Sequence, residues 1–158
     1  MASDHELFMD RAMALAAQAM SEGNRPAGCV IVKDGKVVGE GRNLVHTEVD
    51  PTAHGEIVAI RRTASSLGTV DLSGCTLYTS MEPCAMCCWA MIDAKIPGLV
   101  LGCRHAQLQR KDIGTYSVEA LVAMTGRALE IITGVRAKEC EEQRRSWSGW
   151  RAFQGEAG

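Results

Sequence analysis

The chain has 158 residues, of which 46% are hydrophobic and 23% are charged, and its formal net charge is -2 at pH 7. This length is typical of one domain, so we expect residues 1–158 to form a single compact core. The composition argues against a disordered chain, no apolar run has the length of a membrane span, and the acidic balance gives no general attraction for nucleic acid.

The periodicity of apolar residues predicts ten elements. Helical spacing begins close to the N-terminus, where Ser3 or Asp4 is expected to cap the first helix. Two β-branched runs flank Asp34 and Gly35, a pair that favours the tight turn of a β-hairpin. The predicted helices cover 4–22, 54–67, 83–94, 118–124 and 136–150, and the predicted strands cover 29–33, 36–39, 76–80, 99–102 and 129–133.

The order of these elements predicts an α/β fold. Helices and strands alternate in the second half of the chain, which requires crossover connections between parallel strands, whereas the hairpin pairs its strands in the antiparallel sense. We therefore expect a three-layer α-β-α architecture, with a five-stranded mixed sheet and helices on both faces.

The N-terminal residues and the cysteine content of the chain indicate the cellular compartment of the protein. Residues 1–6 are polar and acidic, unlike a secretory signal, and the seven cysteines are an odd number. We therefore expect a cytoplasmic protein whose cysteines are metal ligands and buried thiols rather than disulfides.

Four residues at the starts of two predicted helices form a zinc-binding pattern. His54 and Glu56 begin one helix, and Cys84 and Cys87 begin the next. At a helix N-terminus, free N–H groups and the helix dipole favour the thiolate that a metal requires. One imidazole and two thiolates supply three ligands, and a fourth position left to water is typical of a catalytic zinc. We expect one Zn²⁺ per chain at His54, Cys84 and Cys87.

Glu56 is the predicted catalytic residue. A carboxylate two residues beyond His54 need not bind the metal, and its position suits a general acid/base that takes a proton from water and gives it to a leaving nitrogen. A metal-activated water and such a carboxylate would together hydrolyse a C–N bond and release ammonia. The pattern thus predicts an aminohydrolase.

These motifs resemble the zinc-dependent cytidine and nucleobase deaminase superfamily, whose signature is His-x-Glu with Pro-Cys-x-x-Cys. The similarity covers nearly the whole chain. Within the superfamily, the Cys-Ala-Met-Cys sequence is similar to the branch that holds free cytosine deaminases, bacterial guanine deaminases and transfer-RNA adenosine deaminases. The resemblance implies a cytidine deaminase-like fold and a homodimer. The segments that carry it are RPAGCV (25–30), GRN (41–43), DPTAH (50–54) and EPCAMC (82–87).

Three candidate substrate-binding residues follow from this resemblance. Asn43 matches the asparagine that hydrogen-bonds the base, although it could instead cap the end of the hairpin. Ala27 stands where relatives often carry a larger apolar side chain, which suggests a wider pocket. Trp89 stands where relatives usually have glycine, so either a neighbouring helix or subunit makes room for it, or it forms part of the pocket wall.

The C-terminal segment 136–158 supplies two more candidates, Trp147 and Trp150. Together with Phe153 they make an aromatic group on the last predicted helix. One interpretation is an amphipathic helix docked on the core; the other is an active-site lid that stacks on a planar ring and excludes water.

Other conspicuous residues are expected to have ordinary roles. Cysteines outside the zinc pattern are expected to be buried, as free cysteines usually are. Histidines outside it are expected at the surface or in loops, and paired basic residues are expected to be solvated. These residues are Cys29, Cys75, Cys88, Cys103 and Cys140, then His46 and His105, and finally the pairs Arg110-Lys111 and Arg144-Arg145.

Three functions are compatible with these features. The favoured one is hydrolytic deamination of a free amino-substituted nitrogen heterocycle, cytosine-like or guanine-like, or a related amino-triazine or pterin. The alternative is a transfer-RNA adenosine-to-inosine deaminase, which is disfavoured by the net charge and by the acidic residues of the last helix. A non-catalytic zinc module is the third, and it would not require Glu56. We therefore expect a small-molecule substrate, no membrane and no nucleic-acid partner.

Overall fold

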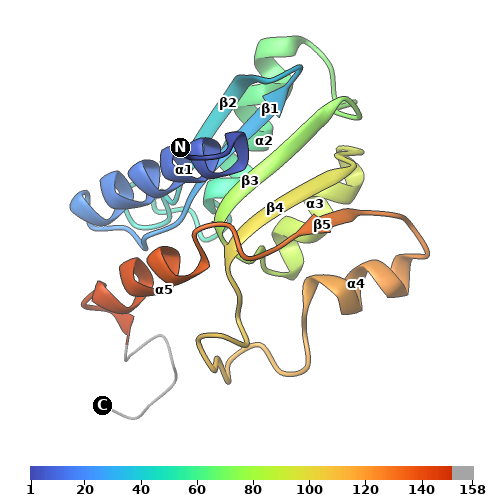
Figure 1. The fold of residues 1–158 in the computed structure, drawn as a ribbon. Coiled ribbons are helices and arrows are strands. Elements are labelled where there is room, and N and C mark those ends of the chain that lie inside the picture. Colours follow the sequence, from blue (N-terminus) through green and yellow to red (C-terminus); the bar gives the residue numbers. More distant parts are fainter. Residues whose placement is uncertain (151–158) are drawn as a thin grey trace.

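The computed structural model describes residues 1–150, and it confirms the predicted order of elements (Figure 1). The rest of the predicted C-terminal segment, 151–158 with Phe153, lies outside the described residues. No helix in the described part is long and apolar enough to cross a bilayer. The helices are α1 (Asp4–Ser21), α2 (Gly55–Leu67), α3 (Ala85–Asp93), α4 (Val118–Thr125) and α5 (Ala137–Ser146), and the strands are β1 (Gly28–Lys33), β2 (Lys36–Arg42), β3 (Cys75–Met81), β4 (Gly98–Cys103) and β5 (Glu130–Ile132).

Local sequence signals explain where several elements begin and end. The Ser3 side chain accepts from the backbone N–H of Glu6, whose carboxylate accepts from the N–H of Ser3, so this capping box fixes the start of α1. Asp34 and Gly35 have φ angles of 51° and 74°, as the tight turn between β1 and β2 requires. Gly68 adopts the left-handed conformation that ends α2.

The five strands form one mixed sheet in the order β2-β1-β3-β4-β5. Strand β1 is antiparallel to β2 and β3, whereas β3, β4 and β5 are mutually parallel. Consequently the N-terminal end of β1 lies beside the C-terminal end of β3, at the same edge of the sheet as the C-terminal end of β4. In α/β sheets this edge, at the carboxyl ends of the parallel strands, is where ligands bind.

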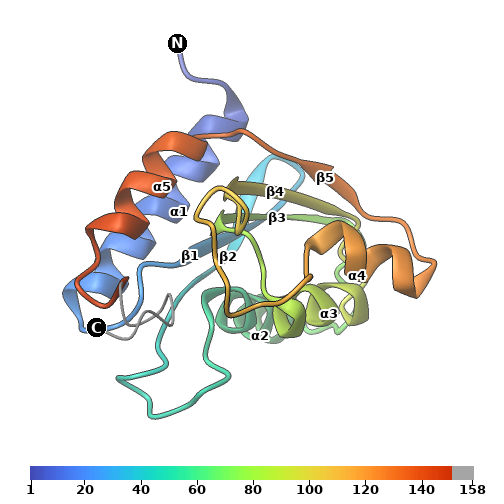
Figure 2. The same cartoon turned by 90° about the horizontal axis from the view of Figure 1, so that it is seen from below.

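Helices cover both faces of the sheet, as predicted. Figure 2 shows α1 and α5 on one face and α2, α3 and α4 on the other. Neighbouring strand residues point to opposite faces, so Val30 packs in the cluster beneath α1 whereas Ile31 packs in the cluster beneath α2 and α3. Burial on both faces explains why the central strands are continuous apolar runs rather than alternating ones.

A glycine lets α2 lie close against the sheet. A Cβ atom on Gly41 would lie 2.3 Å from the carbonyl oxygen of Gly55 and 2.5 Å from the backbone nitrogen of Ala59. Only glycine allows this approach of β2 to the first turns of α2. This contact determines the distance between α2 and the sheet. It thereby also determines the position of His54, the residue before α2.

The prediction of a C-terminal helix over 136–150 is wrong at the C-terminal end of that helix. Helix α5 stops at Ser146, and Trp147 has the extended angles φ -69° and ψ 130°. The chain leaves the helix there because the Trp147 ring folds back, with the guanidinium of Arg144 5.2 Å from its centroid and Gly149 against its edge. A side chain at position 149 would collide with this ring.

Candidate metal centre and active-site cavity

A cavity of about 600 Å³ opens at the carboxyl end of β3. Its wall combines the loop before β1, the starts of α2 and α3, the loop after β4 and the end of α5. Residues from all parts of the chain therefore meet there. The lining residues are Arg25, Ala27, Asn43, His46, His54, Glu56, Met81, Glu82, Cys84, His105, Arg110, Asp112, Arg144, Trp147 and Gly149.

His54, Cys84 and Cys87 converge at one side of this cavity. His54 is the residue before α2 and Cys84 the residue before α3, and both have extended backbone angles. His54 Nδ1 lies 3.5 Å from Cys84 Sγ and 3.6 Å from Cys87 Sγ, and the two sulfurs are 3.6 Å apart. In the described part of the chain this is the one group of three His, Cys, Asp or Glu side chains arranged to hold a metal ion.

These separations fit a tetrahedral zinc ion. With Zn–S of about 2.3 Å and Zn–N of about 2.0 Å, tetrahedral angles place two sulfurs about 3.8 Å apart and a sulfur about 3.5 Å from a nitrogen. The observed distances agree within a few tenths of an ångström. The three donors occupy one face of such a tetrahedron, so the fourth position remains for a small ligand.

The electrostatics of the two thiols also suit a divalent cation. The Cys87 thiol and the His54 imidazole lower the pKa of Cys84 to about 4, whereas the Cys84 thiolate and burial raise the pKa of Cys87. Two thiolates this close repel each other unless a cation lies between them. The donor set therefore matches the charge of Zn²⁺, and the zinc-binding nature predicted from the sequence is confirmed.

Glu56 lies beside this centre in the first turn of α2. Its side chain is buried and lines the cavity, and its Oε1 atom lies 2.9 Å from the hydroxyl of Thr79 on β3. Burial, together with the negative charge of Cys84, raises the pKa of the Glu56 carboxyl. A carboxyl group with a raised pKa is suited to both accepting and donating a proton near neutral pH.

Asn43 and Ala27 both line the cavity, as the sequence predicts for substrate-binding residues. Asn43 follows β2; its backbone N–H donates to the carbonyl of Ala27, and its Oδ1 accepts from the N–H of Val45. With Oδ1 engaged in this way, the amide NH₂ group is the part of the side chain left to donate to a ligand. Asn43 therefore closes the end of the hairpin and also borders the cavity, and its hydrogen bond to a base stays a prediction.

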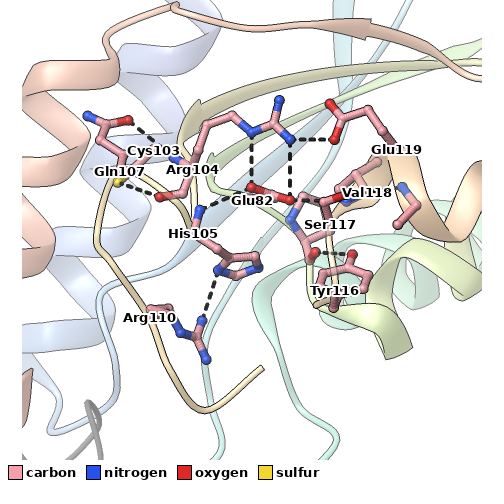
Figure 3. A network of polar contacts seen from close by, with 12 residues as sticks. Glu82, Cys103, Arg104, His105, Gln107, Arg110, Tyr116, Ser117, Val118 and Glu119 are labelled. Atoms are coloured by element: carbon pink, nitrogen blue, oxygen red, sulfur yellow. Dashed lines mark hydrogen bonds and ion pairs between the residues drawn. The ribbon is translucent and has the colours of Figure 1, made fainter. Parts of the chain in front are cut away.

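A buried carboxylate anchors the loop that carries Cys84. Glu82 accepts hydrogen bonds from Arg104 Nε and from the backbone N–H groups of His105 and Val118, all at 3.0 to 3.1 Å (Figure 3). These contacts tie the end of β3 to the end of β4 and the start of α4. The sequence motif EPCAMC includes Glu82 but does not indicate this anchoring role, because its partners lie 22 to 36 residues away.

The three tryptophans of the sequence prediction have different positions. Trp147 lines the cavity, whereas the structure does not bring the other two to it. Trp89 lies on α3 with 47% of its surface exposed, and Trp150 packs against the apolar cluster between α1, α5 and the sheet. Trp89 therefore does not line the cavity of the single described chain, and its role stays a prediction.

The expectation for two of the arginines is wrong, whereas that for the histidines is confirmed. His46 and His105 lie in loops and do not join the metal donors, although both line the cavity and His105 is only 3% exposed. Arg144 was expected on a solvated face, but it is 4% exposed. Arg110 also lines the cavity, with its guanidinium bound to Asp112 and to Nδ1 of His105. Residues from distant segments of the chain surround these side chains at the cavity, and the spacing of residues in the sequence does not reveal such contacts.

The expectation for the remaining cysteines is confirmed. All of them are buried, and none forms a disulfide in the described structure. Cys88 packs in the cluster between α3 and the sheet and does not join the metal donors. Cys29, Cys75, Cys103 and Cys140 are likewise buried free thiols.

Comparison with known proteins agrees with this arrangement. Residues 2–103 match the family model described as the cytidine and deoxycytidylate deaminase zinc-binding region. That range includes the three metal donors and Glu56. The family model and the structure therefore identify a zinc-binding region in the same part of the chain.

The similar proteins include deaminases that are named for different substrates. Over 103 residues the chain is 45% identical to the guanine deaminase of Bacillus subtilis (strain 168), and this alignment covers 65% of the chain and 66% of that enzyme. Over 139 residues it is 36% identical to the tRNA-specific adenosine deaminase of Haemophilus influenzae, covering 87% of the chain and 79% of that protein. A solved structure from studies of A-to-I editing by tRNA:A34 deaminases superimposes with a TM-score of 0.75 at 32% identity, over 86% of the chain and 97% of that structure.

Proposed function

Because the chain belongs to the family of the cytidine and deoxycytidylate deaminase zinc-binding region, it is an enzyme of the deaminase type, and we propose that its substrate is a small amino-substituted nitrogen heterocycle. In this reaction water adds its oxygen to the ring carbon that bears the amino group. The C–N bond then breaks, ammonia leaves, and a carbonyl group remains on the ring. The observation that carries the proposal is a buried Glu56 beside a group of three metal donors at one cavity.

We propose that His54, Cys84 and Cys87 hold the zinc ion of this reaction. When bound there, zinc supplies the Lewis acidity that makes a water molecule nucleophilic near neutral pH. The positions of these residues at the starts of α2 and α3 support this assignment, because the free N–H groups of a helix start stabilise negative charge on the sulfurs.

Glu56 is assigned the proton transfers. Its carboxylate accepts a proton from the attacking water and delivers it to the amino nitrogen, so that ammonia rather than an amide ion departs. Burial and the hydroxyl of Thr79 hold the carboxyl group in one place beside the cavity. A module that only bound zinc would gain nothing from a buried carboxylate there, since such burial costs free energy.

The remaining cavity residues are assigned to substrate orientation. Asn43 donates its amide N–H to an acceptor on the ring, Ala27 leaves space beside it, and Trp147 forms an apolar wall for a planar ring. The wall residue belongs to the segment 136–158 that we propose as a lid within a single domain spanning 1–158. Truncation after Arg145 is expected to weaken substrate binding while the zinc content stays unchanged.

Deamination of adenosine in transfer RNA is the second candidate, and the Haemophilus relative and the tRNA:A34 deaminase structure favour it. Two features of this chain support a small molecule instead. The net charge is -2, and Glu139 and Glu142 are exposed on α5, the helix whose Arg144 lines the cavity. Binding of several phosphates would require a basic surface in their place.

One assay separates these candidates. Ammonia release is measured with free bases, pterins, nucleosides and a transfer-RNA anticodon stem-loop, using protein loaded with one zinc per chain. Turnover of a small heterocycle supports the proposal, and turnover of the stem-loop alone contradicts it. Glu56→Gln should keep the zinc and lose about 10²- to 10⁴-fold in kcat, as expected when a positioned proton carrier is removed. Glu48→Gln, an exposed carboxylate in the loop before α2, is the matched control and should be fully active.

A homodimer is also proposed. Helix α3 follows the zinc cysteines and carries the exposed apolar side chains of Met86 and Trp89. Exposed aromatic and methionine side chains are typical of the buried centre of a protein interface. We propose that this side of α3 contacts a second copy of the chain.

A further inference from the structure

We propose that Tyr116 is a positioning residue of the metal centre: its hydroxyl group fixes the peptide unit that precedes Cys84 and thereby sets the direction of the Cys84 thiolate. This inference rests on the zinc site proposed above and adds a supporting residue to it. Tyr116 is not itself one of the metal donors, and it lies beyond residues 2–103, the range that matches the family model.

The Tyr116 hydroxyl donates to the backbone carbonyl of Pro83, with 2.5 Å between the two oxygens. A phenol is protonated at neutral pH, and burial raises the pKa of Tyr116 further, so the hydroxyl keeps its proton for this bond. The ring packs on the apolar cluster between α3 and the sheet. The imidazole of His105 lies beside it, with 5.8 Å between the ring centroids, and also contacts the Pro83 backbone. Tyr116 is therefore a fixed donor within the polar network around Glu82 (Figure 3).

The carbonyl of Pro83 and the nitrogen of Cys84 belong to one planar peptide unit. A hydrogen bond to this oxygen therefore also fixes the plane from which the Cys84 side chain extends. On the other side of Cys84, its own carbonyl accepts from the N–H of Cys88 at 2.9 Å. Both peptide units that flank Cys84 are held, and the residue between them has the extended angles φ -69° and ψ 174°.

The residues before Cys84 leave one backbone rotation for Tyr116 to restrain. Glu82 is hydrogen-bonded to neighbouring segments through both its carboxylate and its backbone N–H. The pyrrolidine ring of Pro83 restricts the φ angle of that residue. Rotation about the ψ angle of Pro83 remains, and it would turn the carbonyl away and move Cys84. The bond from Tyr116 opposes this rotation.

The position of Cys84 matters because the donors must be close together to share one ion. Its sulfur lies 3.5 Å from His54 Nδ1 and 3.6 Å from the sulfur of Cys87. Cys87 is held within α3, whereas Cys84 precedes that helix and depends on the loop after β3. A donor that is already in place loses less conformational entropy when the metal binds. Groups that orient metal ligands in this way typically contribute about 10- to 100-fold to metal affinity.

The test uses the two tyrosines of the chain as a matched pair. Tyr116→Phe removes only the hydroxyl oxygen at Pro83. Tyr78→Phe removes the hydroxyl that lies 2.8 Å from Nδ1 of His5, in the cluster beneath α1 on the other face of the sheet. Each variant loses one tyrosine hydroxyl and keeps its ring, so a merely structural effect should appear in both.

Two properties of the full-length protein are measured. The affinity for zinc is determined by competition with a chelator. The absorption spectrum is recorded after zinc is replaced with Co²⁺, since the visible bands of Co²⁺ depend on the positions of its ligands. Neither measurement requires a substrate.

We expect Tyr116→Phe to weaken the affinity for zinc by about 10-fold or more and to shift the Co²⁺ bands. Tyr78→Phe should bind zinc within about 3-fold of the wild-type affinity, with the wild-type spectrum, because its hydroxyl does not contact the loop before α3.

Different results identify different failures. An unchanged zinc affinity in Tyr116→Phe, an equal loss in both tyrosine variants, or a loss with the wild-type Co²⁺ spectrum would overturn this inference and leave the zinc site and the proposed deamination standing. A wild-type protein that binds no zinc through His54, Cys84 and Cys87 would overturn the proposed zinc site and this inference with it.

Discussion

The hydroxyl oxygen of Thr79 lies 2.9 Å from Oε1 of Glu56 and 2.9 Å from the backbone carbonyl oxygen of Met81. A hydroxyl has one proton and two lone pairs, so it donates to Glu56 when the carboxylate is ionised. When Glu56 is protonated, the hydroxyl accepts from it and donates to Met81 instead. Thr79 is therefore placed to stabilise both states of the proposed proton carrier.

The first prediction concerns this hydroxyl. Thr79→Val keeps the shape of the side chain and removes both hydrogen bonds, so kcat should fall by about 10-fold or more while the zinc content remains unchanged. Thr76→Val, on the same strand and remote from the cavity, should retain the wild-type kcat. Steady-state kinetics with metal analysis tests this, and an unchanged kcat in Thr79→Val would show that Glu56 does not depend on Thr79.

The second prediction concerns the carboxylate that anchors the zinc-cysteine loop. Glu82→Gln removes the negative charge that two backbone N–H groups and Arg104 share, so the free energy of unfolding should fall by about 2 kcal/mol. Glu119→Gln removes the exposed partner of Arg104, and it should change the free energy of unfolding by less than about 0.5 kcal/mol. Urea unfolding of the zinc-loaded variants measures both values. Equal effects would mean that burial of Glu82 contributes nothing.

The third prediction concerns the contact between β2 and α2. Gly41→Ala places a methyl group within 2.5 Å of the backbone of α2, so the helix must move and the free energy of unfolding should fall by about 1–3 kcal/mol. Because His54 precedes this helix, the affinity for zinc should fall as well. Gly74→Ala, where the nearest atom lies 3.4 Å away, is the control. Competition with a chelator measures the zinc affinity. Equal zinc affinity in both variants would show that the position of α2 does not determine how tightly the site binds zinc.

The fourth prediction concerns the exposed side of α3. Trp89→Glu places a charge at the proposed contact between two copies, so the protein should change from dimer to monomer while the zinc content is retained. Val70→Glu, an exposed apolar residue between α2 and β3, should leave the assembly unchanged. Light scattering after gel filtration gives the mass. A Trp89→Glu protein of unchanged mass would mean that this side of α3 is not the interface.

The zinc donors and the order of elements could be predicted because their signals are local. Apolar periodicity identifies each helix and strand, and Asp34-Gly35 specifies its turn without help from distant residues. His54 and Cys84 each come immediately before a helix, so the fold brings them together once the strand order is given. The predicted zinc pattern and the observed donor geometry agree for this reason.

The arginines that line the cavity could not be predicted from the same patterns. Arg144 stands beside Arg145 in a charged helix, and only the docking of α5 on the sheet decides which of the two is buried. Arg25 and Arg110 line the same cavity from two different loops, and contacts of Glu82 with Arg104 and His105 hold the start of the loop that carries Arg110. The predicted end of the last helix, at residue 150, is wrong as well. The helical pattern of the sequence continues to that residue, but Trp147 packs on Arg144 and the helix ends at Ser146. Long-range side-chain packing produces all of these features.

X-ray absorption at the zinc edge of the purified protein tests the proposed metal centre most directly. We predict one zinc per chain, with two sulfur neighbours at about 2.3 Å and two nitrogen or oxygen neighbours at about 2.0 to 2.1 Å. His54→Ala and Cys87→Ala should each lose the metal or change these neighbours, whereas Cys88→Ala should not. A shell of four sulfurs, or a protein that contains no zinc and still releases ammonia at the full rate, would contradict the assignment.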